Sequence, residues 1–400
     1  MTVGSPHGAP RLTGGGSLRR HRRALGWTAA GLAAAVLLFA LPVPYVRLAP
    51  GPMFNTIGDL DGTPLITISG TEVYPVTGEL NMTTVSESGG PTGYLIVGDA
   101  LLGWLNPDTA VVPRSQMYPA DLTAQQVRAR NRAAFSGSQS DAIAAALGYL
   151  TIDARPTVIV RSLQVGGPAD GPLEPGDRVL AVDDRPTTTP ADVVAAVRDR
   201  AIGDSVTVRV QRGDETIEEV LTTIAATPTR ADGTVDPQAR PVPIIGAAIG
   251  VAVDPPFDID FEIDRVGGPS AGLMFTLGIV DKLTPGSLTG GLRIAGTGTI
   301  SPDGSVGPVG GVRHKIAAAR DRGAALFLVP RDNCEDATTV SPGAMRLIVV
   351  DSLAAAVAAI EEYRADTGSG SDPGSATDPH SGPASGGSPG TPLRCPPASA

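Results

Sequence analysis

Two residues in the C-terminal half of the chain have side chains that together could carry out nucleophilic catalysis. Ser270 lies in the small-residue run "GGPSAG", and Lys315 lies in "GGVRHKIAAAR". A serine hydroxyl becomes a good nucleophile when a nearby base removes its proton. A desolvated lysine can be that base, whereas arginine keeps its proton. Apart from Lys282, every other basic side chain is arginine, so a lysine at position 315 suggests a base.

Other interpretations of these residues compete with catalysis. A serine at the start of a helix is most often only an N-cap. His314 is the other group beside Lys315 that can titrate near neutral pH, and adjacent helical residues point about 100° apart. Only one of the two can face the serine, and Val312 and Ile316 mark the buried side of the helix. We therefore favour Lys315 as the base.

The nucleophile requires a strand-to-helix turn that holds it in place. Strict alternation of apolar and acidic residues over 257–264 predicts a half-exposed strand, and the apolar pattern after Ser270 predicts a helix. Amides at a helix N-terminus favour negative charge. We therefore expect backbone amides within 267–272, those of Gly268 and Ala271 included, to hold an oxyanion.

The base is expected on a second helix that follows an apolar strand. "LRIAGTGTI" predicts the strand, "SPDGS" a turn, and the pattern over 311–322 a helix closed by Gly323. The segment "GTGTISPDG" also follows a strand, but a turn stands where a nucleotide-binding loop needs a helix, so a nucleotide site is not favoured.

Composition limits the classes of function. The length of 400 residues predicts two or three domains, and the formal net charge of −10 argues against a nucleic-acid partner. Three of the four histidines lie in flanking segments, and two cysteines are too few for a thiolate site, so we expect no metal and no cofactor. If the chain lies outside the cytoplasm, a disulfide bond between Cys334 and Cys395 is possible.

The N-terminus predicts a membrane anchor. The cluster "RRHRR" precedes residues 24–46, which carry no formal charge and are long enough to cross a bilayer. Arginines before the span place the N-terminus in the cytoplasm and the rest outside, as a single-pass protein of the plasma membrane. A cleaved signal peptide is the alternative, but Leu38 stands at the −3 position of a cut after Ala40.

The middle of the chain predicts a β-rich region and then a mixed module. Short β-branched runs alternate with turns up to about residue 122, and helices are expected from Thr123 and Ser138, the second ending at Gly148. Residues 157–224 then predict strand, turn, strand, helix, strand, strand. Thr189 is the expected N-cap of that helix, which should reach about Arg200.

Part of this module, with "GGPAD" followed by "GDRVLAVDD", resembles a bacterial PDZ domain over about 70 residues. The resemblance implies capture of extended peptides by strand addition, with loop amides holding a terminal carboxylate. The candidate loop is Leu147, Gly148, Tyr149 and Leu150. Gly148 could equally do no more than end the preceding helix, so both interpretations stay open.

The segment from "GGPSAGLMF" to "GGVRHKIAAARDRGAALFLVP" resembles the proteolytic domain of the Lon family over about 100 residues. That resemblance implies Ser270 as nucleophile, Lys315 as general base, Thr297 as an orienting residue beside the lysine, and assembly of protomers into a homo-oligomer. The sequence departs from the family at His314, which stands where other Lon proteases commonly carry an acidic residue. It also lacks the Gly-Lys of an ATPase phosphate loop.

The order of modules resembles the membrane-anchored PDZ-Lon proteases of Gram-positive bacteria. The prediction is an ATP-independent serine endopeptidase that cleaves extracytoplasmic polypeptides, with the PDZ domain presenting or gating substrate; the alternative is a non-catalytic PDZ scaffold. The predicted architecture is α+β and multidomain: cytoplasmic basic tail 1–23, transmembrane helix 24–46, β-rich extracytoplasmic region 47–122, helical lead-in and PDZ domain 123–226, linker 227–243, Lon-like proteolytic domain 244–364 and disordered tail 365–400.

Overall fold

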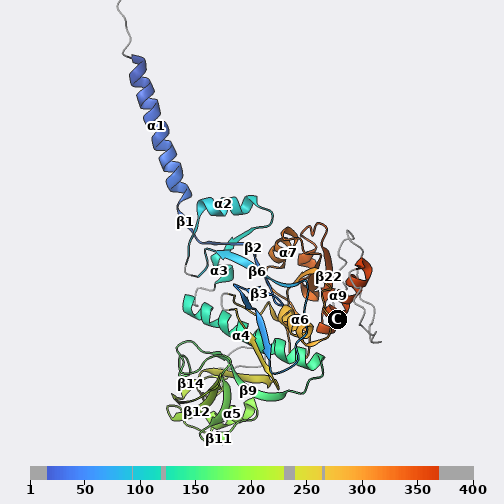
Figure 1. Cartoon of the computed structure of the whole chain (residues 1–400). Coiled ribbons are helices and arrows are strands. Elements are labelled where there is room, and N and C mark those ends of the chain that lie inside the picture. Colours follow the sequence, from blue (N-terminus) through green and yellow to red (C-terminus); the bar gives the residue numbers. More distant parts are fainter. Residues whose placement is uncertain (1–15, 92, 119–122, 229–238, 264–265, 369–400) are drawn as a thin grey trace, which may run out of the picture. The chain divides into compact units, whose positions relative to one another are not determined.

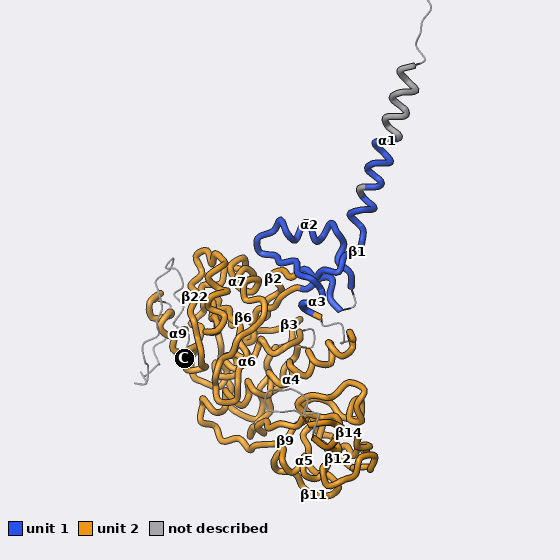
Figure 2. Tube along the Cα trace, turned by 180° about the vertical axis from the view of Figure 1, so that it is seen from behind, with its two compact units in different colours: residues 1–47, 87–117 blue, residues 48–86, 118–400 orange. Residues whose placement is uncertain are grey.

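The computed structural model describes residues 16–91, 93–118, 123–228, 239–263 and 266–368. The chain forms two compact units, one of residues 1–47 with 87–117 and one of residues 48–86 with 118–400, which are coloured separately in Figure 2. Strands β2 (Tyr45–Asn55) and β6 (Glu79–Ser88) run from one unit into the other.

The first unit contains the helix predicted as a membrane span, but this helix is shorter at its C-terminal end than expected. Helix α1 covers Gly16–Phe39, and the chain is extended from Pro42, because Pro42 and Pro44 cannot continue a helix. Within the part of the chain that the structure describes, no helix is both long and apolar enough to cross a membrane. The other elements are β1 (Pro42–Val43), which pairs with β7 (Leu95–Ile96), α2 (Val97–Leu105), β8 (Ala110–Pro113) and α3 (Arg114–Met117).

The second unit is built around a sheet that joins distant parts of the sequence. Within this unit its strand order is β22-β21-β18-β6-β2, in which β18 (Arg293–Gly296) pairs in parallel with β6 and with β21 (Leu326–Pro330), and β22 (Arg346–Val350) pairs with β21. Figure 1 labels β2, β6 and β22 of this sheet. The region 47–122 was predicted as a module of its own. Instead, β6 is an inner strand of this sheet and lies between β2 and β18. Four consecutive residues of β6 are buried, which requires a strand on each edge and packing on both faces.

Alternate residues of β21 enter two different cores. Leu326 and Leu328 belong to the cluster formed with α4, α6 and α9, whereas Phe327 and Val329 belong to the cluster formed with α7 and α8. Helices therefore cover both faces of this sheet. Their bounds are α4 Ala124–Tyr149, α6 Gly272–Leu283, α7 Val312–Asp321, α8 Cys334–Ala337, which follows the 3₁₀ turn Arg331–Asn333, and α9 Leu353–Thr367.

Smaller strand pairs complete this part of the fold. The strand expected over 257–264 is β17 (Asp258–Phe261), and it pairs with β5 (Ile66–Ser69). The remaining pairs are β3 (Asp59–Leu60) with β4 (Thr63–Pro64), β14 (Ile224–Ala226) with β15 (Val242–Ile244), and β19 (Thr299–Ile300) with β20 (Val306–Gly307).

A separate sheet carries the module predicted over 157–224. Its order is β13-β12-β10-β9-β16, with β9 Arg155–Leu163, β10 Arg178–Val182, β12 Ser205–Arg212, β13 Glu215–Thr222 and β16 Ala247–Asp254; β11 (Arg185–Pro186) pairs with β10. The predicted N-cap at Thr189 is confirmed as a capping box, and α5 spans Pro190–Arg198. The edge strand β16 comes from beyond the linker and pairs with the whole of β9.

Helix α4 differs from the expectation of two helices. It is one helix that begins with the predicted capping box at Thr123. Ser138 does not cap a second helix: it lies inside α4, and its hydroxyl donates to the carbonyl of Pro269 at 3.1 Å. A serine whose hydroxyl is bonded to another segment does not compete with its own helix backbone, so the helix continues.

Several predicted boundaries fall near or outside the ends of the described segments. The predicted tail from 365 is wrong for its first residues, because α9 continues to Thr367. The rest of the tail, residues 1–15 and most of the linker lie outside the described residues. Cys334 is buried at the start of α8 and is disulfide-bonded, whereas Cys395 lies outside the described residues.

Candidate active site at a serine and a buried lysine

The turn before α6 holds Ser270 through its backbone. The N-cap of α6 is Ala271, which makes no side-chain cap, so Ser270 precedes the cap residue and the N-cap interpretation of the serine is wrong. The carbonyl oxygen of Ser270 accepts from the Gly298 amide at 3.1 Å and from Thr297 Oγ1 at 3.0 Å. Both donors follow β18, so the end of that strand fixes the serine turn.

The residues before the serine are tied to α4. Gly268 has a φ of +87°, a conformation that favours glycine, and its amide donates to the carbonyl of Asn131 at 3.1 Å. The next residue, Pro269, accepts the bond from Ser138 described above. Two points on α4 therefore fix the path of the chain immediately before the nucleophile.

Lys315 is almost completely enclosed. Its residue is 2% exposed, and its Nζ donates to Thr297 Oγ1 at 2.8 Å. Burial disfavours the charged ammonium and lowers the pKa of Lys315 from 10.5 to about 7. A substantial fraction of the lysine is therefore neutral at physiological pH, as a general base requires.

Thr297 connects the two predicted catalytic residues. Its side chain is fully buried, accepts from the lysine and donates to the carbonyl of the serine. The structure thus brings Ser270, Thr297 and Lys315 together at the junction of α6, β18 and α7. This arrangement matches the orienting position predicted for Thr297.

Helix α7 presents the lysine inward, as predicted. Gly311 precedes the helix with a φ of +68°, and Val312 and Ile316 are buried in the core beside β21. His314 is also buried, at 7% exposed, so both neighbours on this helix are enclosed.

The start of α6 can supply donors to an oxyanion. The amide of Leu273 already donates to the carbonyl of Gly298 at 3.2 Å, which leaves the amides nearer the serine, such as that of Ala271, for a ligand. Those amides lie at the positive end of the helix dipole, where negative charge is stabilised.

The predicted carboxylate loop of the second module does not form a loop. Leu147, Gly148 and Tyr149 make up the last turn of α4, and Leu150 is its C-cap. The helix is closed by bonds from Thr151 to Gly148 and from Ile152 to Leu147. A local apolar-Gly-apolar pattern cannot by itself distinguish a helix end from a binding loop, and here the helix end is the outcome.

Another segment, which the sequence did not single out, has the same apolar-Gly-apolar pattern and lies at the start of an edge strand, where a carboxylate-binding loop is expected. Ile245, Gly246 and Ala247 directly precede or begin the edge strand β16, and Gly246 has a φ of +75°. Beyond β9 no other described strand pairs with β16, and α5 packs against it. The sequence "PIIGAAIG" could have indicated this loop, but it lies after the linker, outside the segment that resembles a PDZ domain.

Comparison with known proteins agrees with both resemblances. Residues 145–222 match the PDZ domain, and residues 265–360 match the Lon protease (S16) C-terminal proteolytic domain. The second match contains Ser270, Thr297 and Lys315. The first ends before β16, so the strand that completes the sheet lies outside it.

The curated relatives are Lon proteases that match over short segments. The chain is 39% identical to the Lon protease of Lawsonia intracellularis over 69 residues, 17% of this chain and 8% of that protein. It is 37% identical to Lon protease 2 of Bacillus subtilis over 83 residues, 20% and 15% of the two chains. The chain therefore matches less than a fifth of the length of either relative.

Among solved structures, the PDZ domain of an SdrC-like protein from Listeria monocytogenes is 22% identical and covers 23% of this chain and 86% of that chain, with a TM-score of 0.19. Together, the family matches identify a PDZ domain and a Lon-type serine peptidase domain in one chain.

Proposed function

From a chain that joins a PDZ domain to a Lon-type serine peptidase domain, we propose an ATP-independent endopeptidase that cleaves extended or unfolded polypeptides. Ser270 is the nucleophile and Lys315 the general base. The observation that carries the proposal is the enclosed lysine, whose pKa is about 7 and whose Nζ is bonded to the threonine that holds the serine turn.

The reaction needs one proton carrier. Neutral Lys315 takes the proton of Ser270 Oγ as that oxygen attacks the peptide carbonyl, and amides at the start of α6 bind the resulting oxyanion. The lysine ammonium then gives this proton to the departing amine, which leaves an ester on Ser270. A water molecule, deprotonated by the lysine, then attacks the ester, and the lysine returns that proton to Ser270 Oγ as the acyl group leaves as a carboxylic acid.

The direct test is cleavage and labelling. Casein, an unfolded protein, incubated with the full chain and no nucleotide should yield peptides, and a fluorophosphonate should inhibit the reaction and add one mass label at Ser270. Binding of casein without cleavage or label would support the PDZ scaffold instead. A peptide with a free carboxyl terminus should alter the casein rate; no effect at saturation would remove the PDZ domain from the proposal.

We further propose that the chain is anchored in the plasma membrane by one helix, with the bulk of the protein outside the cytoplasm. The support is the uncharged segment from residue 24 together with exposed apolar side chains on two elements. Trp27 and Leu37 are 79% and 69% exposed on α1, and Leu102 and Leu105 are 65% and 81% exposed on α2. Exposed apolar surface of this kind is typical of protein or membrane contacts.

Helix α2 begins beside the end of α1. The Val97 amide donates to the carbonyl of Leu41 at 3.0 Å, and β1 pairs with β7. The exposed leucines of α2 are accompanied by Trp104, which is 57% exposed, a residue suited to the boundary between lipid and water. In the proposal, α2 therefore lies at the membrane surface.

Tryptophan fluorescence tests this placement, because Trp27 and Trp104 are the only tryptophans. The full-length Trp27→Phe variant, reconstituted into vesicles, should show blue-shifted Trp104 emission that is quenched by lipids brominated near the head group. The Trp104→Phe variant reports on α1 in the same way. Quenching of Trp27 alone would support the membrane anchor but reject the placement of α2 at the membrane surface. Quenching of neither tryptophan would reject both proposals.

The homo-oligomer implied by the Lon resemblance also stays a proposal. The mass of the detergent-solubilised full chain, measured by light scattering, should be a multiple of the protomer mass of 40.6 kDa. A mass equal to that of a single protomer at every concentration tested would reject the homo-oligomer.

A further inference from the structure

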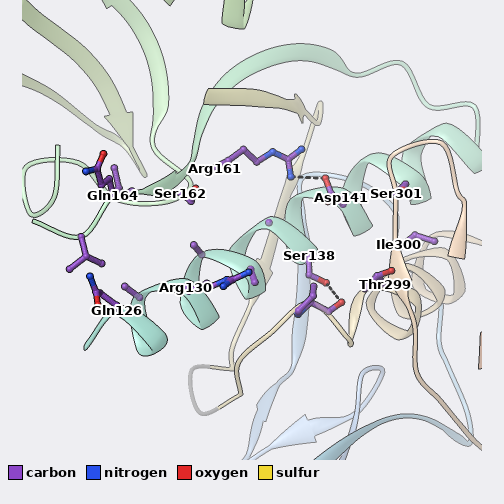
Figure 3. Close-up of a pocket in the computed structure, with 17 residues that line it drawn as sticks. Gln126, Arg130, Ser138, Asp141, Arg161, Ser162, Gln164, Thr299, Ile300 and Ser301 are labelled. Carbon is purple, nitrogen blue, oxygen red and sulfur yellow. Dashed lines mark hydrogen bonds and ion pairs between the residues drawn. The ribbon is translucent and has the colours of Figure 1, made fainter. Parts of the chain in front are cut away.

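A cavity of about 770 Å³ opens next to the serine turn, within the second unit (Figure 3). Its walls are one side of α4, the end of β9 with the turn that follows, and β19. This volume is in the range of pockets that bind ligands the size of a drug molecule. The lining residues include Gln126, Arg130 and Ser138 of α4, Arg161 and Gln164 near the end of β9, and Thr299 of β19.

The cavity lies beside the proposed active site and shares residues adjacent to it in sequence. Pro269, the residue before the nucleophile, is part of its wall, and Ser138 of α4 binds the Pro269 carbonyl. At the same end, Thr299 lies two residues after Thr297. A polypeptide whose scissile bond lies at Ser270 can therefore continue along α4 into this space.

The charges in the wall are not balanced. The charge of Arg161 is neutralised within the protein, because one guanidinium nitrogen pairs with Asp141 at 2.8 Å. Another guanidinium nitrogen donates to the carbonyl of Val251 at 2.7 Å. Arg130, by contrast, is exposed and its side chain makes no ion pair or hydrogen bond with any residue that the structure describes. Among the described residues that line the cavity, Asp141 is the only acidic one, so they carry one uncompensated positive charge.

The helix that carries Arg130 supplies no nearby carboxylate to balance it. Helix α4 contains no acidic residue before Asp141, and its other arginines, Arg128 and Arg132, lie outside the cavity lining. The whole chain carries a formal net charge of −10, so this basic stretch runs against the overall charge. A basic wall at a substrate cavity attracts acidic ligands and repels basic ones.

We propose that this cavity binds the part of the substrate next to the scissile bond and that Arg130 selects an acidic side chain there. The inference rests on the proposed peptidase function and adds a substrate class to it. Arg130 is eight residues before Ser138, which is about 12 Å along a helix. An extended chain covers that length in about three or four residues, which sets the expected position of the acidic residue relative to the cut.

The test is an aspartate scan in neutral, internally quenched peptides with amidated C-termini, so that the aspartate is the only carboxylate. In the full-length wild-type protein, one or two neighbouring positions, about three or four residues from the cut, should raise kcat/KM roughly five- to tenfold over the neutral peptide. In Arg130→Glu, this preference should disappear and a lysine at the same position should be favoured. Arg130→Gln should abolish the preference without reversing it.

Arg128→Glu is the matched control, because it makes the same charge change two residues away, about 200° around the helix and outside the cavity lining. Its aspartate preference should equal that of the wild type. A flat scan in the wild type, a preference that survives in Arg130→Glu, or equal loss in both variants would overturn the proposal.

A binding measurement separates this inference from the proposed function. Ser270→Ala protein should bind the preferred aspartate peptide more tightly than the neutral one by fluorescence anisotropy, and the difference should be lost in Ser270→Ala combined with Arg130→Glu. Binding selectivity without any cleavage by wild type would reject the peptidase function and retain the acidic site. Equal binding of the two peptides would reject the acidic site whatever the wild type cleaves.

Discussion

Replacement of Lys315 by arginine should lower kcat for peptide hydrolysis by roughly 10³-fold or more while the protein stays folded. A general base typically contributes about 10²- to 10⁴-fold. Arginine retains the positive charge but does not release its proton in the pH range of the assay, so it cannot activate Ser270. The measurement is single-turnover hydrolysis of a quenched peptide by wild type and variant, with the near-ultraviolet spectrum as the check on folding.

The pH dependence gives a second observable. Since burial lowers the pKa of Lys315 to about 7, the wild-type rate should be low below pH 6, rise through pH 7 and level off as the lysine becomes neutral. The matched control is Lys282→Arg, which changes the only other lysine, at the end of α6. It should leave both the rate and the pH profile as in the wild type; an active Lys315→Arg variant would refute the role of the lysine.

Replacement of Thr297 by valine should have the second largest effect, roughly a 10- to 100-fold loss of kcat. Valine keeps the shape of the fully buried side chain but removes the acceptor for Lys315 Nζ and one donor to the Ser270 carbonyl. The Gly298 amide still satisfies that carbonyl, so the turn should persist. Loss of an acceptor for the ammonium form disfavours that form, so the rising limb of the pH profile should move to lower pH.

Two comparisons make the Thr297 result specific. Thr297→Ser restores the hydroxyl and should recover most of the rate. Thr276→Val alters another fully buried threonine, whose Oγ1 bonds to Gly272 within α6, and should leave the pH profile unchanged. If the serine variant is as slow as the valine variant, the threonine has a packing role rather than a positioning one.

Local signals in the sequence predicted the immediate surroundings of the base. Gly311 and Gly323 bound the helix of Lys315 in the structure as they did in the sequence, because both adopt left-handed conformations at the ends of a helix. Thr297 was different: its position followed from the family resemblance, and no local pattern would have selected it. Its contacts join residues from three elements, which propensity and spacing do not reveal.

Long-range pairings account for the main errors in the fold. Nothing within residues 79–88 indicates that β6 pairs with β18, more than 200 positions later. Likewise, the "LGYL" segment has the composition of a carboxylate loop, but packing of Leu147, which is 1% exposed, retains it in α4. Ser138 appeared to begin a helix because its role in holding Pro269 depends on the folded chain.

The path of the chain through β9 and β16 determines how the PDZ sheet is attached to the rest of the second unit. The chain enters this sheet from α4, and several residues of α4 pack against α6 in the core. The chain leaves the sheet through β16, a few residues before β17. The PDZ sheet is thus an insertion with two covalent connections to the peptidase core, rather than a pendant domain on one tether. An insertion of this kind cannot rotate freely about a single hinge. A force on β16 is transmitted through the backbone towards the segment that leads to Ser270.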